Sequence, residues 1–232
     1  MSVAPQPFAE NIWLVGGPTT EVFGFRYPTR TVIIRLSDGG LFVWSPTNLT
    51  DELRSSVDAL GDVRFLVAPN SLHHLFLGEW REAYPAAKLY APPGLRHRRK
   101  DLTFDADLDD MPPPEWSRDI DQVVVRGNLI TTEVAFFHYA SRTAIFTDLI
   151  QHLDPSALAG WRAQVARFDL MAGPQPETPR KFRIAFFNRG AARKAIRHAL
   201  AWPTARVVMA HAVPVEHEGQ AFLVRVFGWL VR

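Results

Sequence analysis

Three mostly apolar segments of this chain run directly into side chains that bind metal ions or carry protons. Residues 63–68 lead into a turn with His73 and His74, residues 144–147 lead to Asp148, and residues 206–210 lead to His211. Neutral imidazole is the commonest metal ligand in proteins, and it titrates near pH 7. Runs of apolar residues of this length are typical of strands buried on both faces. The pattern predicts a sheet-based fold in which several strands end on polar, chemically capable groups.

The size and composition of the chain narrow its class. With 232 residues, of which 47% are hydrophobic, residues 1–232 are expected to form a single domain with a large core. The chain has no cysteine, so it has no disulfides, no thiolate nucleophile and no cysteine-based zinc site. The basic run at residues 96–100 is followed at once by an acidic stretch, and the formal net charge is only +2. We therefore expect no nucleic-acid partner.

The first residues and the hydropathy pattern indicate a cytoplasmic protein. The N-terminal sequence lacks the basic and apolar regions of a signal peptide. No apolar run approaches the ~20 residues that cross a bilayer, so no membrane partner is expected. A small-molecule substrate or ligand is expected but not identified, and the oligomeric state stays open.

Strands and helices alternate along the chain in a way that predicts two sheets covered by helices. Thr50 has the features of a helix N-cap, and the prolines and glycines mark turns. The predicted strands are 11–15, 22–26, 31–36, 41–44, 63–68, 88–91, 120–126, 131–139, 143–150 and 206–210. The predicted helices are 50–60, 76–83, 189–202 and a C-terminal one from about residue 220. The expected class is α/β.

The chain order resembles the metallo-β-lactamase superfamily over nearly all of its length. The resemblance rests on a β meander, the PNSLHH segment after a buried strand at residues 69–74, a strand ending in Thr147-Asp148, and Ala210-His211 after a helix and a strand. An uncharacterised branch of the superfamily shares the patterns PNxxHH and SRTxxxTD. The resemblance implies an αββα four-layer sandwich with a metal site at one edge of the sheets.

Much of the superfamily's metal motif is missing here. Ser45 stands where the first aspartate turn belongs, and Asn128 stands at the position of a turn histidine. The PNSLHH segment aligns with the HxHxDH motif in a register that lacks two of its ligands. The resemblance then implies a degenerate site in which His74, Asp148 and His211 hold zinc or iron.

Two further residues are candidates for activating water in such a site, namely His73 and Glu133. With the hairpin turn at residues 140–142, Asp148 is expected opposite about Ala135, which puts Glu133 on the same face as Asp148. His138 then lies on the other face, roughly 10 Å along the strand from the position opposite Asp148. We expect His138 to stay outside the site, and its role is open.

Each candidate also has a purely structural interpretation. The two adjacent histidines can cap a helix, and Asp148 with His211 can form an ion pair that braces two strand ends. The sequence favours a non-catalytic binding or scaffold domain with a metallo-β-lactamase-like fold. The alternative is a metal-dependent hydrolase of esters, thioesters or phosphodiesters.

Overall fold

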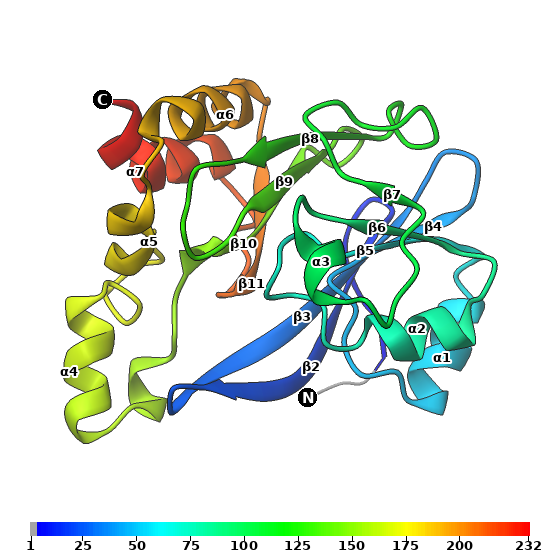
Figure 1. Cartoon of the computed structure of the whole chain (residues 1–232), viewed down its shortest axis with the longest axis horizontal. Coiled ribbons are helices and arrows are strands. Elements are labelled where there is room, and N and C mark those ends of the chain that lie inside the picture. Colours follow the sequence, from blue (N-terminus) through cyan, green and yellow to red (C-terminus); the bar gives the residue numbers. More distant parts are fainter. Residues whose placement is uncertain (1–3) are drawn as a thin grey trace.

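A computed structural model describes residues 4–232 and arranges them in four layers (Figure 1). Helices α1 (Asp51–Asp58) and α2 (Leu77–Ala83) cover the first sheet. A second sheet packs on the other face of the first, and helices α6 (Arg189–Ala201) and α7 (Gly219–Val231) cover it. The αββα sandwich predicted from the sequence is confirmed.

The first sheet has the strand order β1-β2-β3-β4-β5-β6-β7. Its strands are antiparallel from β1 to β4 and parallel from β4 to β7. Their bounds are β1 Gln6–Ala9, β2 Ile12–Val22, β3 Phe25–Arg35, β4 Leu41–Trp44, β5 Val63–Val67, β6 Lys88–Ala91 and β7 Ala106–Asp107. The short helix α3 (Leu95–Arg98) connects the last two.

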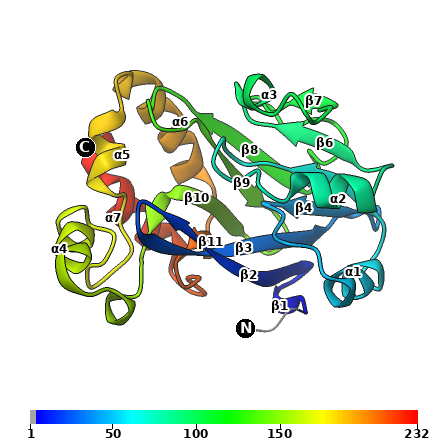
Figure 2. The same ribbon diagram turned by 60° about the horizontal axis from the view of Figure 1, so that its bottom comes forward.

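The second sheet has the order β11-β10-β9-β8. Strands β8, β9 and β10 form an antiparallel meander, and β11 joins β10 in parallel. Their bounds are β8 Ile120–Val125, β9 Glu133–His138, β10 Thr143–Gln151 and β11 Arg206–His211. Between β10 and α6 the chain forms a 3-10 turn (Pro155–Ala157) and helices α4 (Gly160–Phe168) and α5 (Arg180–Ala185), which lie beside the β2–β3 hairpin in both ribbon views (Figure 2).

Alternation along the strands explains why both faces of the first sheet are covered. Successive side chains of a strand point to opposite faces. Phe42 and Trp44 pack between the two sheets, whereas Leu41 and Val43 pack under α1 and α2. All four of these side chains are buried, which is why β4 is apolar at every position.

The N-terminal hairpin differs from its prediction. Residues 22–26 were expected to form a strand, but Val22 pairs with Phe25 and the two residues between them make the hairpin turn. The long strands β2 and β3 flank this turn. Gly16, Gly17 and Pro18 interrupt the apolar pattern without ending β2. The strand predicted at residues 11–15 therefore continues to Val22, and the turn lies where a second strand was predicted.

Several other predicted elements are confirmed. The Thr50 side chain accepts a hydrogen bond from the backbone N–H of Leu53, as expected of an N-cap. Helices α6 and α7 lie where the sequence placed them. The short helices α3, α4 and α5 were not predicted. Among the described residues, no helix is long and apolar enough to span a membrane.

The packing between the sheets gives a test of stability. Phe136 is fully buried there, with its ring centroid 5.6 Å from that of Phe42. We expect Phe136→Ala to lower the free energy of unfolding by about 3–5 kcal/mol, because it removes buried apolar area and leaves a cavity. Phe187, whose side chain is 71% exposed, provides a matched control. Phe187→Ala should change the free energy by less than about 0.5 kcal/mol in the same urea titration.

Candidate functional site

His73, Asp148 and His211 converge where strands of the two sheets end. The Nε2 atoms of the two histidines are 3.1 Å apart. Asp148 lies 3.3 Å from each of them, through Oδ2 to His73 and through Oδ1 to His211. Their side chains are only 6–9% exposed. Among residues 4–232 this is the only group of three histidine, cysteine or acidic side chains close enough to hold one metal ion.

The orientation of His211 is fixed by a backbone carbonyl. Its Nδ1 lies 2.7 Å from the carbonyl oxygen of Pro28 on β3. A carbonyl only accepts hydrogen bonds, so Nδ1 carries the proton and donates it. In the neutral ring, Nε2 then has a lone pair directed at Asp148 and His73. Such a bond from the remote nitrogen to a carbonyl is usual for metal-binding histidines.

His73 is oriented by a serine at the end of β4. Its Nδ1 is 2.8 Å from Oγ of Ser45, which either donates or accepts depending on the histidine tautomer. Ser45 has a positive φ of 51°, an uncommon backbone conformation for a residue other than glycine. Ser45, which stands where the resemblance implies an aspartate, thus contacts the site through its hydroxyl group.

Two amide side chains hold Asp148 in place. Asn70 donates from Nδ2 to Asp148 Oδ2 over 2.7 Å, and Gln151 donates from Nε2 to Oδ1 over 2.9 Å. Asn70 also accepts, through Oδ1, hydrogen bonds from the backbone N–H groups of Leu72 and His73. This fully buried asparagine therefore links the carboxylate to the turn that carries His73. No sequence pattern indicated these roles: Asn70 was noted only as part of the PNSLHH segment, and Gln151 was not a candidate.

Glu133 lies on β9 next to Asp148, with its carboxylate engaged by the backbone. It accepts hydrogen bonds from the N–H groups of Thr147, Asp148 and Leu149 at 2.8–3.0 Å. The expected register was wrong by two residues: Thr143 pairs with His138, so the same register places Asp148 opposite Glu133 rather than Ala135. A shift of two keeps each side chain on its face, so Glu133 still shares the face of Asp148.

The two buried carboxyl groups have opposite electrostatic environments. Burial raises the pKa of Glu133 to about 7, with a further increase from the charge of Asp148, and the amide donors offset only part of this. Burial also raises the pKa of Asp148, but His73 and His211 outweigh that effect and hold it well below its usual range. Asp148 is therefore the ionised member of the pair at neutral pH.

The structure separates the two adjacent histidines. His74 is not in the group; its Nδ1 lies 3.0 Å from Nη1 of Arg99, which also donates to the His74 carbonyl oxygen. Burial lowers the pKa of His74, and the nearby charges of Arg99 and Arg98 lower it further. The turn after β5 thus directs His73, and not the expected His74, toward Asp148.

His138 also lies outside the group. It is buried at the far end of the β9–β10 hairpin, and its Nδ1 is 2.8 Å from Oγ of Ser141. Ser141 in turn donates to Oγ1 of Thr143. These contacts hold the hairpin turn, and they give His138 a structural environment.

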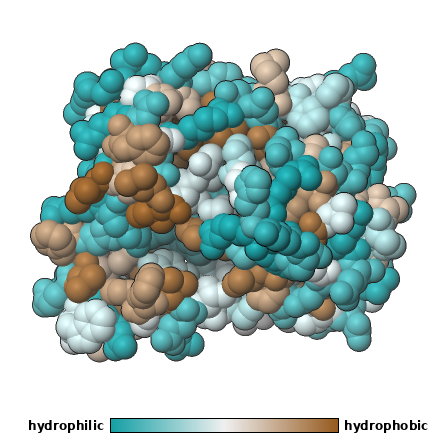
Figure 3. All heavy atoms as spheres, viewed as in Figure 1, coloured by the Kyte–Doolittle hydropathy of each residue, from teal (hydrophilic) through white to brown (hydrophobic). Residues whose placement is uncertain are grey.

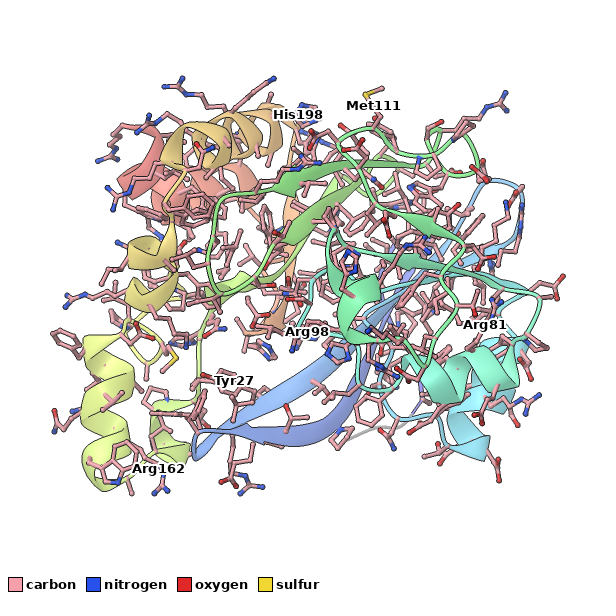
Figure 4. The ribbon with its side chains drawn as sticks, viewed as in Figure 1. Tyr27, Arg81, Arg98, Met111, Arg162 and His198 are labelled. Carbon is pink, nitrogen blue, oxygen red and sulfur yellow. The ribbon has the colours of Figure 1, made fainter. Side chains whose placement is uncertain are left out.

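Tyr27 and Lys181 form the side of the site that faces helix α4. The Tyr27 ring lies 5.2 Å from the His211 ring (Figure 4). Lys181 is 3.3 Å from the Tyr27 hydroxyl and 3.4 Å from Asp169. Burial lowers the pKa of Lys181 despite the nearby carboxylates. No sequence pattern indicated either residue, because they come from β3 and α5 and meet only in the fold.

Comparison with solved structures identifies the fold. A metallo-β-lactamase from Pontibacter korlensis has a TM-score of 0.66 at 12% identity, with 99% of each chain covered. One from Hirschia baltica has a TM-score of 0.63 at 12% identity, covering 97% of this chain and 98% of that one. The mono-zinc form of FIM-1 from Pseudomonas aeruginosa has a TM-score of 0.65 at 9% identity, covering 99% and 96%. Identities this low establish the fold alone.

Sequence comparison assigns the family. No curated protein sequence matches the chain. The profile of one family, described as a domain of unknown function (DUF4336), matches residues 9–172, which is more than half of the chain. This match shows that the chain belongs to the DUF4336 family, and the structural comparisons show that it has the metallo-β-lactamase fold.

Proposed function

We propose that His73, Asp148 and His211 hold a single divalent metal ion, zinc or iron, and that the protein is a metal-dependent hydrolase. The observation that carries this proposal is the convergence of three donor atoms at 3.1–3.3 Å, with the His211 lone pair directed at the other two. Two histidines and one carboxylate are a ligand set used by catalytic zinc and by non-haem iron.

The spacing of the donors fits such an ion. Tetrahedral bonds of 2.0–2.1 Å from zinc to nitrogen or oxygen separate neighbouring ligands by about 3.3 Å. The three donor pairs here lie 3.1, 3.3 and 3.3 Å apart. Three protein ligands leave a further coordination position, which distinguishes catalytic zinc sites from closed structural ones.

The bound ion would supply Lewis acidity toward a carbonyl or phosphoryl oxygen and toward water. The chain's own residues orient the ligands. Pro28 and Ser45 hold the two imidazoles through Nδ1, and Asn70 and Gln151 hold the carboxylate of Asp148. Esters, thioesters and phosphodiesters are the substrate classes that this chemistry serves.

Glu133 acts in this proposal as a positioning residue. Both of its oxygens are occupied by the amides of Thr147, Asp148 and Leu149, so it fixes the backbone that carries Asp148. His73 acts as a ligand rather than as the base that activates water. The cytoplasmic location and the absence of a nucleic-acid partner stay predictions.

A second candidate is a non-catalytic binding or scaffold domain without metal. It is favoured by the near-complete burial of the group and by the two amides that already satisfy Asp148. One proton on Nε2 of His73 can bridge to Asp148 Oδ2 while Ser45 donates to Nδ1. In this version the three side chains brace the ends of β5, β10 and β11.

Metal content separates the two candidates. The purified protein is expected to contain close to one zinc or iron per chain by mass spectrometry of the metal. His211→Ala and Asp148→Asn should each lose most of it, because only two ligands remain. A chelator should lower the melting temperature of the wild-type protein, since the metal stabilises only the folded state.

His74→Ala is the matched control for this experiment. It removes a neighbouring imidazole that contacts Arg99 and not Asp148, so metal content should stay at the wild-type level. Metal-free wild-type protein, with a melting temperature that chelators do not change, would instead support the scaffold. Equal loss in His74→Ala and His211→Ala would contradict the ligand set.

The raised pKa of Glu133 predicts a pH dependence of the metal-free protein. In the unfolded chain this carboxyl ionises near pH 4.5, and in the folded state at about 7. Between these values the folded state binds more protons, so the free energy of unfolding should fall as the pH rises from about 5 to 7. The decrease is at most about 3 kcal/mol at 1.4 kcal/mol per pKa unit.

Glu133→Gln should remove that decrease, because the amide does not titrate. Urea titrations of both proteins at pH 5, 6 and 7 in the presence of a chelator measure it. A slope that persists unchanged in the glutamine variant would assign the titration to another group.

A further inference from the structure

An apolar surface projects from the corner formed by α4 and the tip of the β2–β3 hairpin. We call it the α4 corner, and it consists of Val22, Phe23, Trp161, Val165 and Phe168. All are exposed, from 42% for Val165 to 93% for Phe23. Apolar side chains gather over this corner at the lower left of the space-filling view (Figure 3).

Helix α4 turns its apolar side to solvent. Trp161, Val165 and Phe168 are spaced as i, i+4 and i+7, which places them on one face of a helix. That face is exposed, and Ala166 is the only buried residue of the helix. An amphipathic helix normally buries such a face, so this one indicates a surface that something else covers.

Phe23 lies in a hairpin turn whose backbone conformation disfavours a bulky side chain. It forms the two-residue hairpin turn with Gly24, and their φ angles are 51° and 78°. Turns with positive φ at both positions favour Asn-Gly or Asp-Gly, because a bulky side chain is strained there. The strained backbone at Phe23 and its almost fully exposed ring together indicate a role outside the folded chain.

The corner also carries uncompensated positive charge. Arg162, Arg167 and Arg180 are exposed, and none forms an ion pair with a carboxylate within residues 4–232. Arg162 lies over the Trp161 ring at 4.9 Å and Arg180 over the Phe168 ring at 4.8 Å.

Two carboxylates of this region have other cationic neighbours. Glu21 lies opposite Arg26 in the hairpin register, and Asp169 lies 3.4 Å from Lys181. The three arginines around the aromatic rings therefore remain as the excess charge.

We propose that the α4 corner docks on an anionic phospholipid surface. Exposed aromatic rings enter the boundary between head groups and acyl chains, while adjacent arginines contact lipid phosphates. The combination at this corner supplies both contributions on one face. No sequence pattern predicted this corner, because the hairpin residues and the helix residues lie more than 130 positions apart and only the fold brings them together.

Two other partners fit the surface less well. In a symmetric dimer the same patch meets itself, so three arginines would face three arginines. Single-stranded nucleic acid stacks its bases on open aromatic faces, but guanidinium groups already lie over Trp161 and Phe168. Val22 and Val165 add apolar area that a lipid phase accommodates and stacked bases do not use.

Part of the α4 corner lines a groove of about 550 Å³, whose lining includes Val22, Phe23, Phe168, Tyr27 and Lys181. The Tyr27 ring contacts His211. A docked molecule would therefore present this opening to the lipid, although docking itself does not depend on the metal proposal.

Vesicle binding by the full chain tests the inference. The wild-type protein should sediment with vesicles that contain phosphatidylglycerol and should bind neutral phosphatidylcholine vesicles at least tenfold more weakly. Phe23→Asn should reduce binding to the anionic vesicles about tenfold while its melting temperature stays equal or rises, because asparagine suits the turn. Arg162→Gln combined with Arg167→Gln should also weaken it about tenfold and remove most of its salt dependence.

Met111→Asn is the control, because Met111 is 78% exposed and lies far from Arg162 (Figure 4). It should leave vesicle binding unchanged. The inference is overturned by equal binding to both vesicle types, by Phe23→Asn binding as well as wild type, or by a preference for single-stranded oligonucleotides or self-association over vesicles. Wild-type binding by His211→Ala would support docking whatever the outcome for the metal.

Discussion

The site is organised around one buried negative charge. The carboxylate of Asp148 faces two imidazole Nε2 atoms at 3.3 Å, and the bond from His211 Nδ1 to Pro28 means that a neutral His211 ring would direct a lone pair at it. Two acceptors at this separation repel each other unless a cation or a proton lies between them. The chemistry of the protein therefore depends on whether the positive charge between these groups is a metal ion or a shared proton.

The strands of both sheets place Asp148 and the two histidines at the junction of the sheets. Strand β10 places Asp148, strand β11 places His211, and the turn after β5 places His73. Where the resemblance to metallo-β-lactamases predicts more ligands, this chain has side-chain amide groups. Asn70 connects the turn after β5 to Asp148, and the Glu133 carboxylate accepts three hydrogen bonds from backbone N–H groups of β10.

The sequence predicted the layers of this fold better than the details of its site. Continuous apolar strands and capped helices follow from local patterns, so the sandwich could be predicted. The choice between His73 and His74 could not, because Asn70 sets the turn through bonds to two backbone amides. Glu133 was placed on the correct face despite a register error of two residues, since face depends only on parity. Helix α4 escaped prediction because it buries almost none of its surface.

The ligand set of two histidines and one carboxylate determines the charge that such a site would carry. Two neutral imidazoles and one carboxylate around a divalent ion would leave a net charge of +1 while Glu133, whose pKa burial raises to about 7, is protonated. Lys181 lies on the α4 side of the site, where it pairs with Asp169. A net positive, nearly buried site favours anionic ligands, because little water screens the attraction. Among the proposed substrate classes, phosphodiesters carry the negative charge that such a site would favour, and neutral esters do not.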